Sequence, residues 1–296
     1  MILVTGVSGF LGTHLLRTLI EIYGQKNVVA LTSKPIIECK YIIHNDYHFD
    51  ENYIINCGFK NIETIIHAGA YTPKSSSDGN HISKCNSNIT STAKLLKSNL
   101  PKIKNFIFFS TLDVYGYDNP ITEETKPLPT SLYGHSKLYC EQMVSFWAAQ
   151  KKVCHQILRI GHVYGEGEEK YQKIIPVTIQ RLISNKPIQI YGDGKEIRSF
   201  IYITDVINAI TNSLALKKFV GIINLVGEEK ISIRSLIDKL VLISGMSPEI
   251  DTIETENVPR DFVFDNSKMK KNLGVPKVEL VEGLNNEWNY MKNLNK

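Results

Sequence analysis

A glycine-rich turn between a short apolar strand and a helix constrains this chain more than any other stretch. Ile2–Thr5 form an apolar, β-prone run, Gly6, Gly9 and Gly12 follow at intervals of three residues, and leucines then recur at helical spacing from Leu11. Such glycines allow a tight exit from the strand, close approach of an anion to backbone N–H groups, and close packing of helix on sheet. Three glycines at this spacing could simply form a flexible loop. The flanking strand and helix instead favour a site for the pyrophosphate of a dinucleotide.

Size and composition leave room for one large α/β unit, or for a nucleotide domain with a smaller appendage. The chain has 296 residues, of which 43% are hydrophobic and 22% charged. A net charge of only +4 without a dense Lys/Arg block argues against nucleic acid or a membrane surface as a partner. Five cysteines without a Cys-x-x-Cys pair predict reduced thiols, and we expect no metal site.

The start of the chain and its apolar runs bear on location. The first expected strand begins at Ile2, which leaves no room for a signal peptide, and no apolar run is long enough to span a bilayer. We therefore expect a cytoplasmic protein.

Strand patterns alternate with helical patterns along most of the chain. Further strands are expected at 28–31, 41–43, 63–67, 105–109, 156–160 and 222–226, and helices over 88–96, from Tyr133 through Trp147, over 170–184 and from about 231. The almost continuous apolar run at 105–109 is typical of a parallel strand that is buried on both faces. Polar residues follow it, at the end of a strand where open α/β sheets bind ligands.

The residues that close the second strand bear on the choice of cofactor. In NAD-specific folds of this type an acidic residue at this place binds the adenosine ribose hydroxyls. Here the positions are Thr32, Ser33 and Lys34, whose hydroxyl and ammonium groups suit a 2′-phosphate. We therefore favour NADP(H), with NAD(H) as the alternative. Lys34 as an ordinary surface lysine before Pro35 is a competing interpretation.

Several stretches resemble one enzyme family. Thr-Gly-Val-Ser-Gly-Phe-Leu-Gly at 5–12 resembles the Thr-Gly-x-x-Gly-x-x-Gly signature of short-chain dehydrogenases, in the extended form of nucleotide-sugar epimerases, dehydratases and reductases. Residues 110–116 are similar to the family's Ser-Ser/Thr-x-x-x-Tyr-Gly segment, and 187–205 to its Pro-x-x-x-x-Gly-x-Gly stretch with a phosphate-binding arginine. Tyr133 and Lys137 stand four apart on an expected helix. Tyr191 and Lys195 have the same spacing, but flanking glycines predict a turn there.

The resemblance implies a fold class and two domains. The expected fold is an α/β Rossmann fold, a doubly wound parallel sheet with a smaller C-terminal α/β lobe that binds substrate. Residues 1–165 and 198–228 would form the dinucleotide-binding domain. Residues 166–197 and 229–296 would form the nucleotide-sugar-binding lobe, with a nucleoside-diphosphate sugar held between the two.

The resemblance also implies roles for particular residues. Tyr133 would be the acid/base, because the cation of Lys137 favours its phenolate; the catalytic set is Thr111, Asp113, Tyr133 and Lys137. Cofactor contacts are expected from Gly6, Ser8, Gly9, Phe10, Leu11, Gly12, Thr32, Ser33, Lys34, Asp46, Tyr47, Ala68, Gly69, Ala70, Asn88, Tyr133 and Lys137. Substrate contacts are expected from Thr72, Thr111, His162, Arg198 and Arg260. His162 departs from the family pattern, which has an asparagine on the substrate diphosphate.

Four functions remain open at this point. The favoured one is NADPH-dependent reduction of a nucleoside-diphosphate 4-keto(-6-deoxy) sugar, as in bacterial-type surface polysaccharide sugar synthesis. The alternatives are an NAD-dependent 4-epimerase and a 4,6-dehydratase. The dehydratases carry an acid at the position of Asp113, but Leu112 stands where they often have a second one. A catalytically silent cofactor-sensing regulator is opposed by the intact Thr, Tyr and Lys set.

A homodimer is also expected from the resemblance. The helices that begin near Asn88 and Tyr133 resemble the family pair that forms an intermolecular four-helix bundle. Phe146, Trp147 and Ala148 would add apolar surface to this face.

Overall fold

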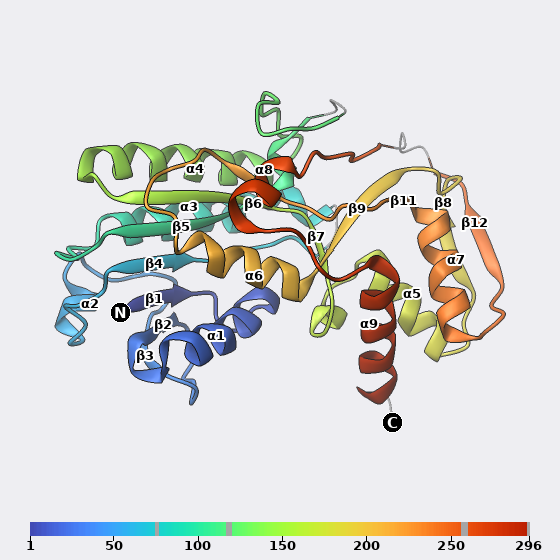
Figure 1. Ribbon diagram of the computed structural model, residues 1–296, viewed down its shortest axis with the longest axis horizontal. Coiled ribbons are helices and arrows are strands. Elements are labelled where there is room, and N and C mark those ends of the chain that lie inside the picture. Colours follow the sequence, from blue (N-terminus) through green and yellow to red (C-terminus); the bar gives the residue numbers. More distant parts are fainter. Residues whose placement is uncertain (75–76, 117–119, 256–259, 295–296) are drawn as a thin grey trace. The chain divides into compact units, whose positions relative to one another are not determined.

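The computed structural model describes residues 1–74, 77–116, 120–255 and 260–294 (Figure 1). Pro259, which precedes the expected substrate residue Arg260, lies outside the described residues. The chain forms two compact units. The first comprises Met1–Gly116, Lys126–Ile160 and Ile207–Ile223, and the second Tyr117–Thr125, Gly161–Val206 and Asn224–Lys296. These limits differ from the expected boundaries at 165, 198 and 228, and the binding role of each part stays a prediction.

The first unit is built on a central sheet with strand order β10-β6-β5-β4-β1-β2-β3. The strands are β1 Ile2–Thr5, β2 Val28–Thr32, β3 Lys40–Ile43, β4 Thr64–His67, β5 Asn105–Thr111, β6 Cys154–Ile160 and β10 Ile223–Leu225. The pairings among β1 to β6 are parallel. The chain builds outward from β1 to β3 and then returns to the other side of β1, so the order reverses between β1 and β4. The expected Rossmann class is confirmed.

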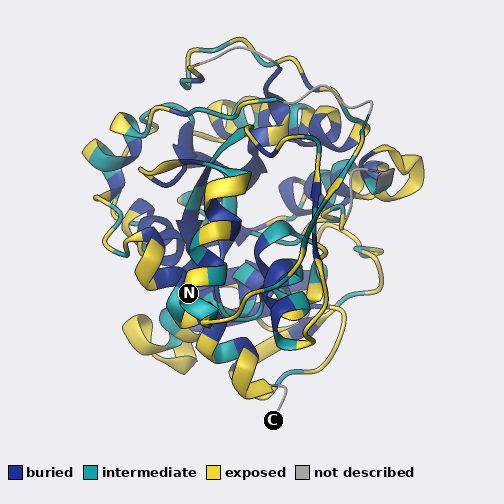
Figure 2. Cartoon of the chain, turned by 90° about the vertical axis from the view of Figure 1, so that its right-hand side faces the viewer, coloured by how far each residue is buried: buried dark blue, intermediate teal, exposed yellow. Residues whose placement is uncertain are grey.

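Helices cover both faces of this sheet. They are α1 Phe10–Tyr23, α2 Tyr53–Asn56, α3 Ile82–Leu96, α4 Leu132–Lys151 and α6 Ile203–Ser213, with 3₁₀ turns η1 Gln25–Asn27, η2 Ser77–Asn80 and η3 Leu112–Val114. Figure 1 shows α3 and α4 side by side on one face and α1 on the other. Apart from the edge strand β3, most residues of the strands are buried and are drawn dark blue in Figure 2. One core cluster joins Leu3 and Phe106 of the sheet to Leu95 and Val144 of α3 and α4. Burial on both faces explains the continuous apolar runs.

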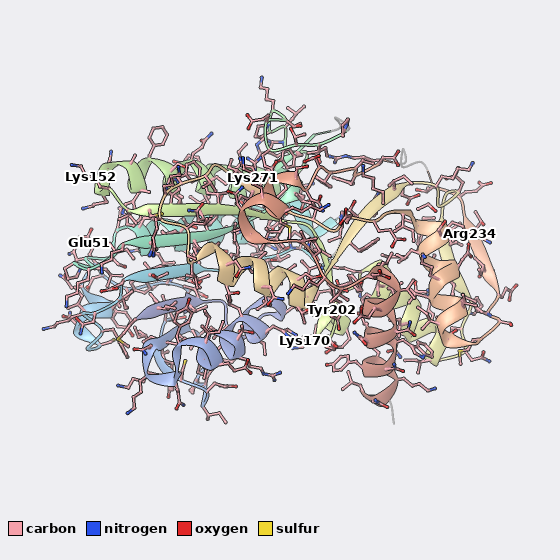
Figure 3. The ribbon with its side chains drawn as sticks, viewed as in Figure 1. Glu51, Lys152, Lys170, Tyr202, Arg234 and Lys271 are labelled. Carbon is pink, nitrogen blue, oxygen red and sulfur yellow. The ribbon has the colours of Figure 1, made fainter. Side chains whose placement is uncertain are left out.

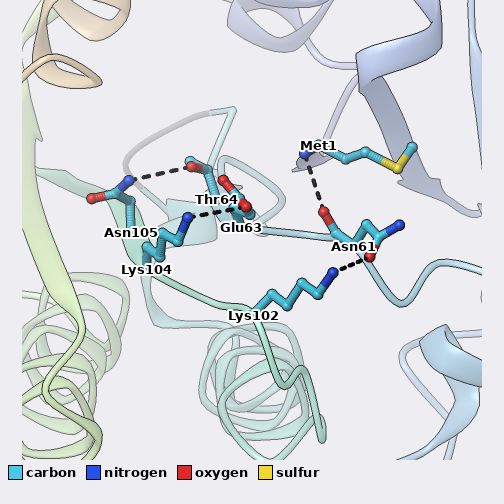
Figure 4. A network of polar contacts seen from close by, with 7 residues as sticks. All are labelled: Met1, Asn61, Glu63, Thr64, Lys102, Lys104 and Asn105. Atoms are coloured by element: carbon cyan, nitrogen blue, oxygen red, sulfur yellow. Dashed lines mark hydrogen bonds and ion pairs between the residues drawn. The ribbon is translucent and has the colours of Figure 1, made fainter.

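Polar contacts hold the opposite, amino-terminal ends of the strands (Figure 4). The terminal amino group of Met1 donates to the Asn61 carbonyl at 3.1 Å, and Lys102 donates to the Asn61 side chain at 2.7 Å. Lys104 forms an ion pair with Glu63 at 3.0 Å. These groups are exposed, so they contribute little individually.

The second unit contains two smaller sheets. One has the order β11-β9-β7 and the other pairs β12 with β8. The elements are β7 His162–Tyr164, η4 Glu168–Lys170, α5 Ile174–Ile183, β8 Ile188–Tyr191, β9 Ile197–Tyr202, β11 Lys230–Ser232, α7 Ile233–Ser244, β12 Ile250–Ile253, α8 Ser267–Leu273 and α9 Leu280–Leu294. Ser232 caps α7, since its side chain accepts a hydrogen bond from the Ser235 N–H.

Three expectations about helices need correction. Helix α3 begins at Ile82, six residues before the expected start, because its first turns bury Cys85 although they are polar in sequence. Helix α5 begins at Ile174 rather than at 170. On α4, Phe146 is 72% exposed as expected, but Ala148 is buried and the Trp147 ring packs 5.4 Å from that of Phe106. Trp147 and Ala148 therefore face the core rather than a partner.

Candidate functional site

The glycine turn after β1 forms a tight cradle at the start of α1. Gly6 has a left-handed φ of 73°, and its carbonyl accepts from the Gly9 N–H at 3.0 Å. A Cβ on Gly12 would lie 1.9 Å from the Gly6 oxygen, so the helix can pack this closely only with glycine there. Gly9 is the N-cap residue and has no side chain to cap the helix. The first-turn N–H groups and the helix dipole therefore fit the pyrophosphate of a dinucleotide.

Tyr47 reaches the end of β1 from the turn after β3. Asp46 and Tyr47 both have positive φ values, 45° and 58°, an uncommon conformation that aims the tyrosine inward. Its hydroxyl would be 2.7 Å from a Cβ on Gly69, which explains the glycine there, and it hydrogen-bonds Thr5. Burial raises the pKa of Tyr47 to about 12, against the effect of the Thr5 hydrogen bond. The expected cofactor residues Asp46, Tyr47 and Gly69 are thus structurally linked.

A buried hydrogen-bond chain that the sequence did not reveal connects β1, β4 and α3. Thr5 Oγ1 lies 2.8 Å from His67 Nδ1, and His67 Nε2 lies 3.1 Å from Thr92 Oγ1.

The side-chain amide of Asn88, an expected cofactor contact, holds the backbone of Tyr71. The Tyr71 N–H donates to Asn88 Oδ1 at 2.7 Å. Asn88 therefore positions the chain that leaves β4.

The other expected cofactor residues lie at the same carboxyl edge of the sheet. Ser8, Phe10 and Leu11 belong to the turn and first helical residues after β1, and Ala68 and Ala70 follow β4. Thr32 closes β2 and is buried, while Ser33 and Lys34 are exposed beyond it.

Thr111 and Tyr133 come together in the first unit. Thr111 ends β5, and Tyr133 lies in the first turn of α4, which Ser131 caps by accepting from the Gly134 N–H at 3.1 Å. A Cβ on Gly134 would lie 2.3 Å from the Asp113 carbonyl, so this glycine lets α4 pack directly on η3. Tyr133 is buried and hydrogen-bonds Thr111 and Thr72.

The charge state of Tyr133 is controlled by its surroundings. Burial raises the pKa of Tyr133 first, the nearby Asp113 carboxylate raises it further, and the hydrogen bonds with Thr72 and Thr111 oppose both. Asp113 is itself exposed, and its carboxylate accepts from the Thr111 hydroxyl at 3.1 Å. Without a bound ligand the phenol is therefore neutral.

Lys137 lies one turn after Tyr133 and is only 3% exposed. Its Nζ stands 4.2 Å from the centre of the Phe108 ring. Burial lowers the pKa of Lys137 to about 8, while Cys140 and Glu141 act to raise it. That Lys137 favours the phenolate of Tyr133 from this position stays a prediction.

Sequence reasoning missed a buried ion pair next to this site. Arg159 on β6 and Glu141 on α4 pair at 2.7 Å inside the first unit. Two signals were present: Glu141 follows Lys137 by one helical turn, and Arg159 interrupts an apolar strand. A charge in a strand that is buried on both faces requires a partner.

The second unit contains a cavity of about 300 Å³ that includes two expected substrate residues, His162 and Arg198. Ile175, Ile190 and Phe200 contribute apolar walls. Its charged lining includes Lys173, which pairs with the buried Glu168 at 2.9 Å and which the sequence did not single out.

His162 is a neutral imidazole in this cavity. Burial lowers its pKa to about 3, and the charges of Arg198 and Lys173 contribute in the same direction. Its Nδ1 is buried and has no hydrogen-bond partner among the described residues. A neutral ring with an unpaired nitrogen can donate or accept one hydrogen bond with a ligand.

Two guanidinium groups contact the same aromatic ring in the second unit. Arg198 and Arg260 lie 5.1 and 3.8 Å from the centre of the Phe262 ring, and Arg198 Nη1 also donates to the Arg260 carbonyl. Burial lowers the pKa of Arg198. Like charges this close favour an anionic ligand such as a diphosphate.

Several carboxylates and phenols of the second unit interact with one another. Tyr202, which is labelled in Figure 3, ends β9, and its hydroxyl donates to Glu166 at 2.7 Å. Burial and the neighbouring Glu168 raise the pKa of Glu287 to about 9, so this carboxyl group is protonated at neutral pH. Among the described residues, no group of three or more His, Cys, Asp or Glu side chains could hold a metal ion.

The parallel sheet, the glycine cradle and the Thr-Tyr-Lys set define an enzyme of the extended short-chain dehydrogenase type. Residues 2–225 match the model of the NAD dependent epimerase/dehydratase family, and the chain belongs to that family. None of the helices in the described ranges is long and apolar enough to cross a membrane.

The chain is similar to nucleotide-sugar epimerases over its whole length. It is 30% identical to a putative UDP-glucose 4-epimerase from Methanocaldococcus jannaschii, covering 100% of each chain. It resembles the crystal structure of UDP-glucuronic acid 4-epimerase from Bacillus cereus in complex with NAD, with 28% identity, a TM-score of 0.85, and 100% and 99% of the two chains covered. It also resembles the crystal structure of UDP-glucose 4-epimerase from Thermotoga maritima with UDP-glucose, with 27% identity, a TM-score of 0.86, and 100% and 99% of the two chains covered. These similarities favour an epimerase over the reductase expected from the sequence.

Proposed function

We propose that this protein is a nucleotide-sugar 4-epimerase that keeps NAD bound and acts on a UDP-hexose or UDP-hexuronic acid. The observation that carries the proposal is Tyr133, buried and hydrogen-bonded to Thr111 with Lys137 one turn away, in a chain similar over its full length to 4-epimerases. Epimerisation at C4 needs one proton removed from the 4-hydroxyl and later returned, which a single tyrosine can do.

The residues of the first unit divide this work. Gly6, Gly9 and Gly12 leave room for the pyrophosphate at the start of α1. When bound, the nicotinamide supplies reversible hydride acceptance and a positive charge. Tyr133 takes the proton of the sugar 4-hydroxyl and returns it after the sugar presents its other face, while the Lys137 cation favours the phenolate.

The cavity of the second unit supports a nucleoside diphosphate as the other part of the substrate. Its apolar walls suit a base, and Arg198 and Lys173 suit phosphate oxygens. His162, at the family's asparagine position, would contribute one neutral hydrogen bond, and Arg260 a second guanidinium beside Phe262.

The reductase, dehydratase and regulator alternatives have less support. The preference for NADP(H) rests on Lys34, which is exposed, whereas the Bacillus cereus epimerase structure holds NAD. Leu112 is an apolar residue buried in the core, so it offers no second acid for dehydration, and Asp113 accepts a hydrogen bond from Thr111. The buried, hydrogen-bonded Tyr133 argues against a silent regulator.

Two measurements on the purified protein test the proposal. Nucleotide released by acid should be NAD in near-stoichiometric amount, and UDP-glucose or UDP-glucuronic acid should convert to the 4-epimer without added cofactor, as followed by NMR. Consumption of NADPH with a 4-keto sugar would instead establish the reductase. Formation of a 4-keto-6-deoxy product would establish the dehydratase.

A further inference from the structure

The first unit encloses a charged pair that the proposed chemistry does not use directly. Arg159 Nε donates to Glu141 Oε1 at 2.9 Å and Arg159 Nη2 donates to Glu141 Oε2 at 2.7 Å. Arg159 is 1% exposed and Glu141 3%. This bidentate geometry joins α4 to β6 inside the core.

Two further contacts connect the pair to the residues that carry Thr111. The Ser110 hydroxyl donates to Glu141 Oε1 at 2.5 Å, and Ser110 immediately precedes Thr111 on β5. The Arg159 guanidinium lies 4.7 Å from the centre of the Tyr115 ring, just after η3. The end of β5 is therefore held on both sides of Thr111 by groups that also hold α4.

The pair also bears on the charge of Lys137. Glu141 lies one helical turn beyond Lys137 and favours its cationic form against the effect of burial. Other titratable groups face this lysine or its tyrosine. They are His67 from β4, Cys140 and Tyr133 from α4, Asp113 from η3 and Cys85 from α3, while Arg159 from β6 faces Glu141.

Stability alone does not account for a buried ion pair. The free energy needed to remove two charges from water is about as large as the free energy gained from their attraction. Well-packed apolar residues often replace such pairs without loss of stability. We propose that Glu141 and Arg159 are positioning residues for the proposed epimerisation: together they fix the end of β5, and with it Thr111, against α4 and Tyr133, and Glu141 places a carboxylate one helical turn from Lys137.

Two variants separate this role from a purely structural one. Glu141→Gln keeps the side-chain shape but removes the charge, and it leaves the buried Arg159 cation without its partner. The double variant Glu141→Met with Arg159→Met replaces both charges by apolar side chains, so it should fold. Glu63→Gln breaks the exposed pair with Lys104 in the same unit and serves as the matched control.

The first measurement uses protein without cofactor or substrate. Lysine labelled with ¹³C at Cε is titrated by NMR, and the Lys137 signal is identified by its loss in Lys137→Met. The wild type should titrate near pH 8. Removing the nearby carboxylate should lower the midpoint by roughly one pH unit in Glu141→Gln, where the Arg159 cation remains, and by less in the double variant, where both charges are gone. Glu63→Gln should leave the midpoint unchanged.

The second measurement is the pH dependence of kcat and KM for epimerisation, and this arm rests on the proposed function. The Lys137 cation exists below its pKa, so a lower pKa moves the alkaline fall of kcat to lower pH. Misplacing Thr111 should also reduce kcat by on the order of 100-fold with a smaller change in KM.

The outcomes are distinct. Unchanged Lys137 midpoints and an unshifted alkaline limb in folded variants would show that the pair is only structural and would overturn the proposal. A double variant that cannot fold would overturn it as well, because the pair would then be required for the fold itself. If the protein lacks epimerase activity, the proposed function fails, while the lysine titration still decides the effect of Glu141 on Lys137.

Discussion

At the scale of single residues, the chemistry depends on how burial balances charge around Tyr133. Burial and Asp113 both raise the pKa of this tyrosine from its ordinary value, while its neighbour Lys137 has a lowered pKa of about 8. The two pKa values are therefore shifted in opposite directions, so without ligands the tyrosine keeps its proton more firmly than the lysine does. An adjacent positive charge from a ligand would lower the pKa of the phenol toward its ordinary value.

Tyr133→Phe tests the acid/base role of Tyr133, because it removes only the phenol hydroxyl. We expect turnover to fall by about 100- to 10,000-fold, because the proton of the sugar hydroxyl loses its acceptor, while NAD affinity changes little. Tyr139→Phe, on the same helix but 51% exposed, should keep full activity. Steady-state kinetics and cofactor titration check both variants, and near-normal kcat in Tyr133→Phe would reject Tyr133 as the acid/base.

At the scale of elements, the cradle depends on the contact between β1 and α1. Gly12 packs so closely on the Gly6 carbonyl that helix and turn act as one unit. Gly24, which ends the same helix, has a left-handed φ of 80° but nothing within 4 Å of an added Cβ. The two glycines thus serve different purposes, close packing and chain reversal.

Gly12→Ala should therefore damage both stability and cofactor binding. A methyl group that meets backbone at 1.9 Å forces α1 away from the turn, which should cost more than about 3 kcal/mol. Gly24→Ala should cost only about 1 to 2 kcal/mol from its left-handed backbone and leave the NAD affinity unchanged. Thermal unfolding and cofactor titration compare them. Equal effects of the two substitutions would contradict the role of Gly12 in the cradle.

Some helices and strands could be predicted from the sequence, and others could not. The strands β1, β4 and β5 and the ends of α1 were predictable within one or two residues, because burial on both faces and the glycine at the helix end leave local signals. The early start of α3 was not, since Cys85 and Asn88 are buried only through packing on α4 and the β4 loop. Trp147 was misplaced for the same reason.

At the scale of the whole molecule, the assembly remains a proposal. Helices α3 and α4 pack on each other and carry Ile82, 67% exposed, and Phe146, 72% exposed. We propose that these side chains contribute to an interface between two copies, as expected from the family resemblance.

Phe146→Glu should convert the proposed homodimer to a monomer, because it places a charge in the apolar interface. Leu242 lies on α7 of the second unit and is 82% exposed, so Leu242→Glu should leave the mass of the assembly in solution unchanged. Sedimentation at micromolar concentration measures both. A wild type that sediments as a monomer would remove the dimer.

The sequence by itself determined the features that depend on near neighbours. The strand, glycine turn and helix at 2–23, and the placing of Tyr133 and Lys137 on one helix, follow from backbone period and from the conformations open to glycine. Only the tertiary structure decided which distant charges meet. Glu141 with Arg159, and Arg198 with Arg260 on Phe262, are separated by 18 and 62 residues in the chain. Which residues meet depends on how the elements pack, and the Arg159 charge is buried only because that packing supplies Glu141 as its partner.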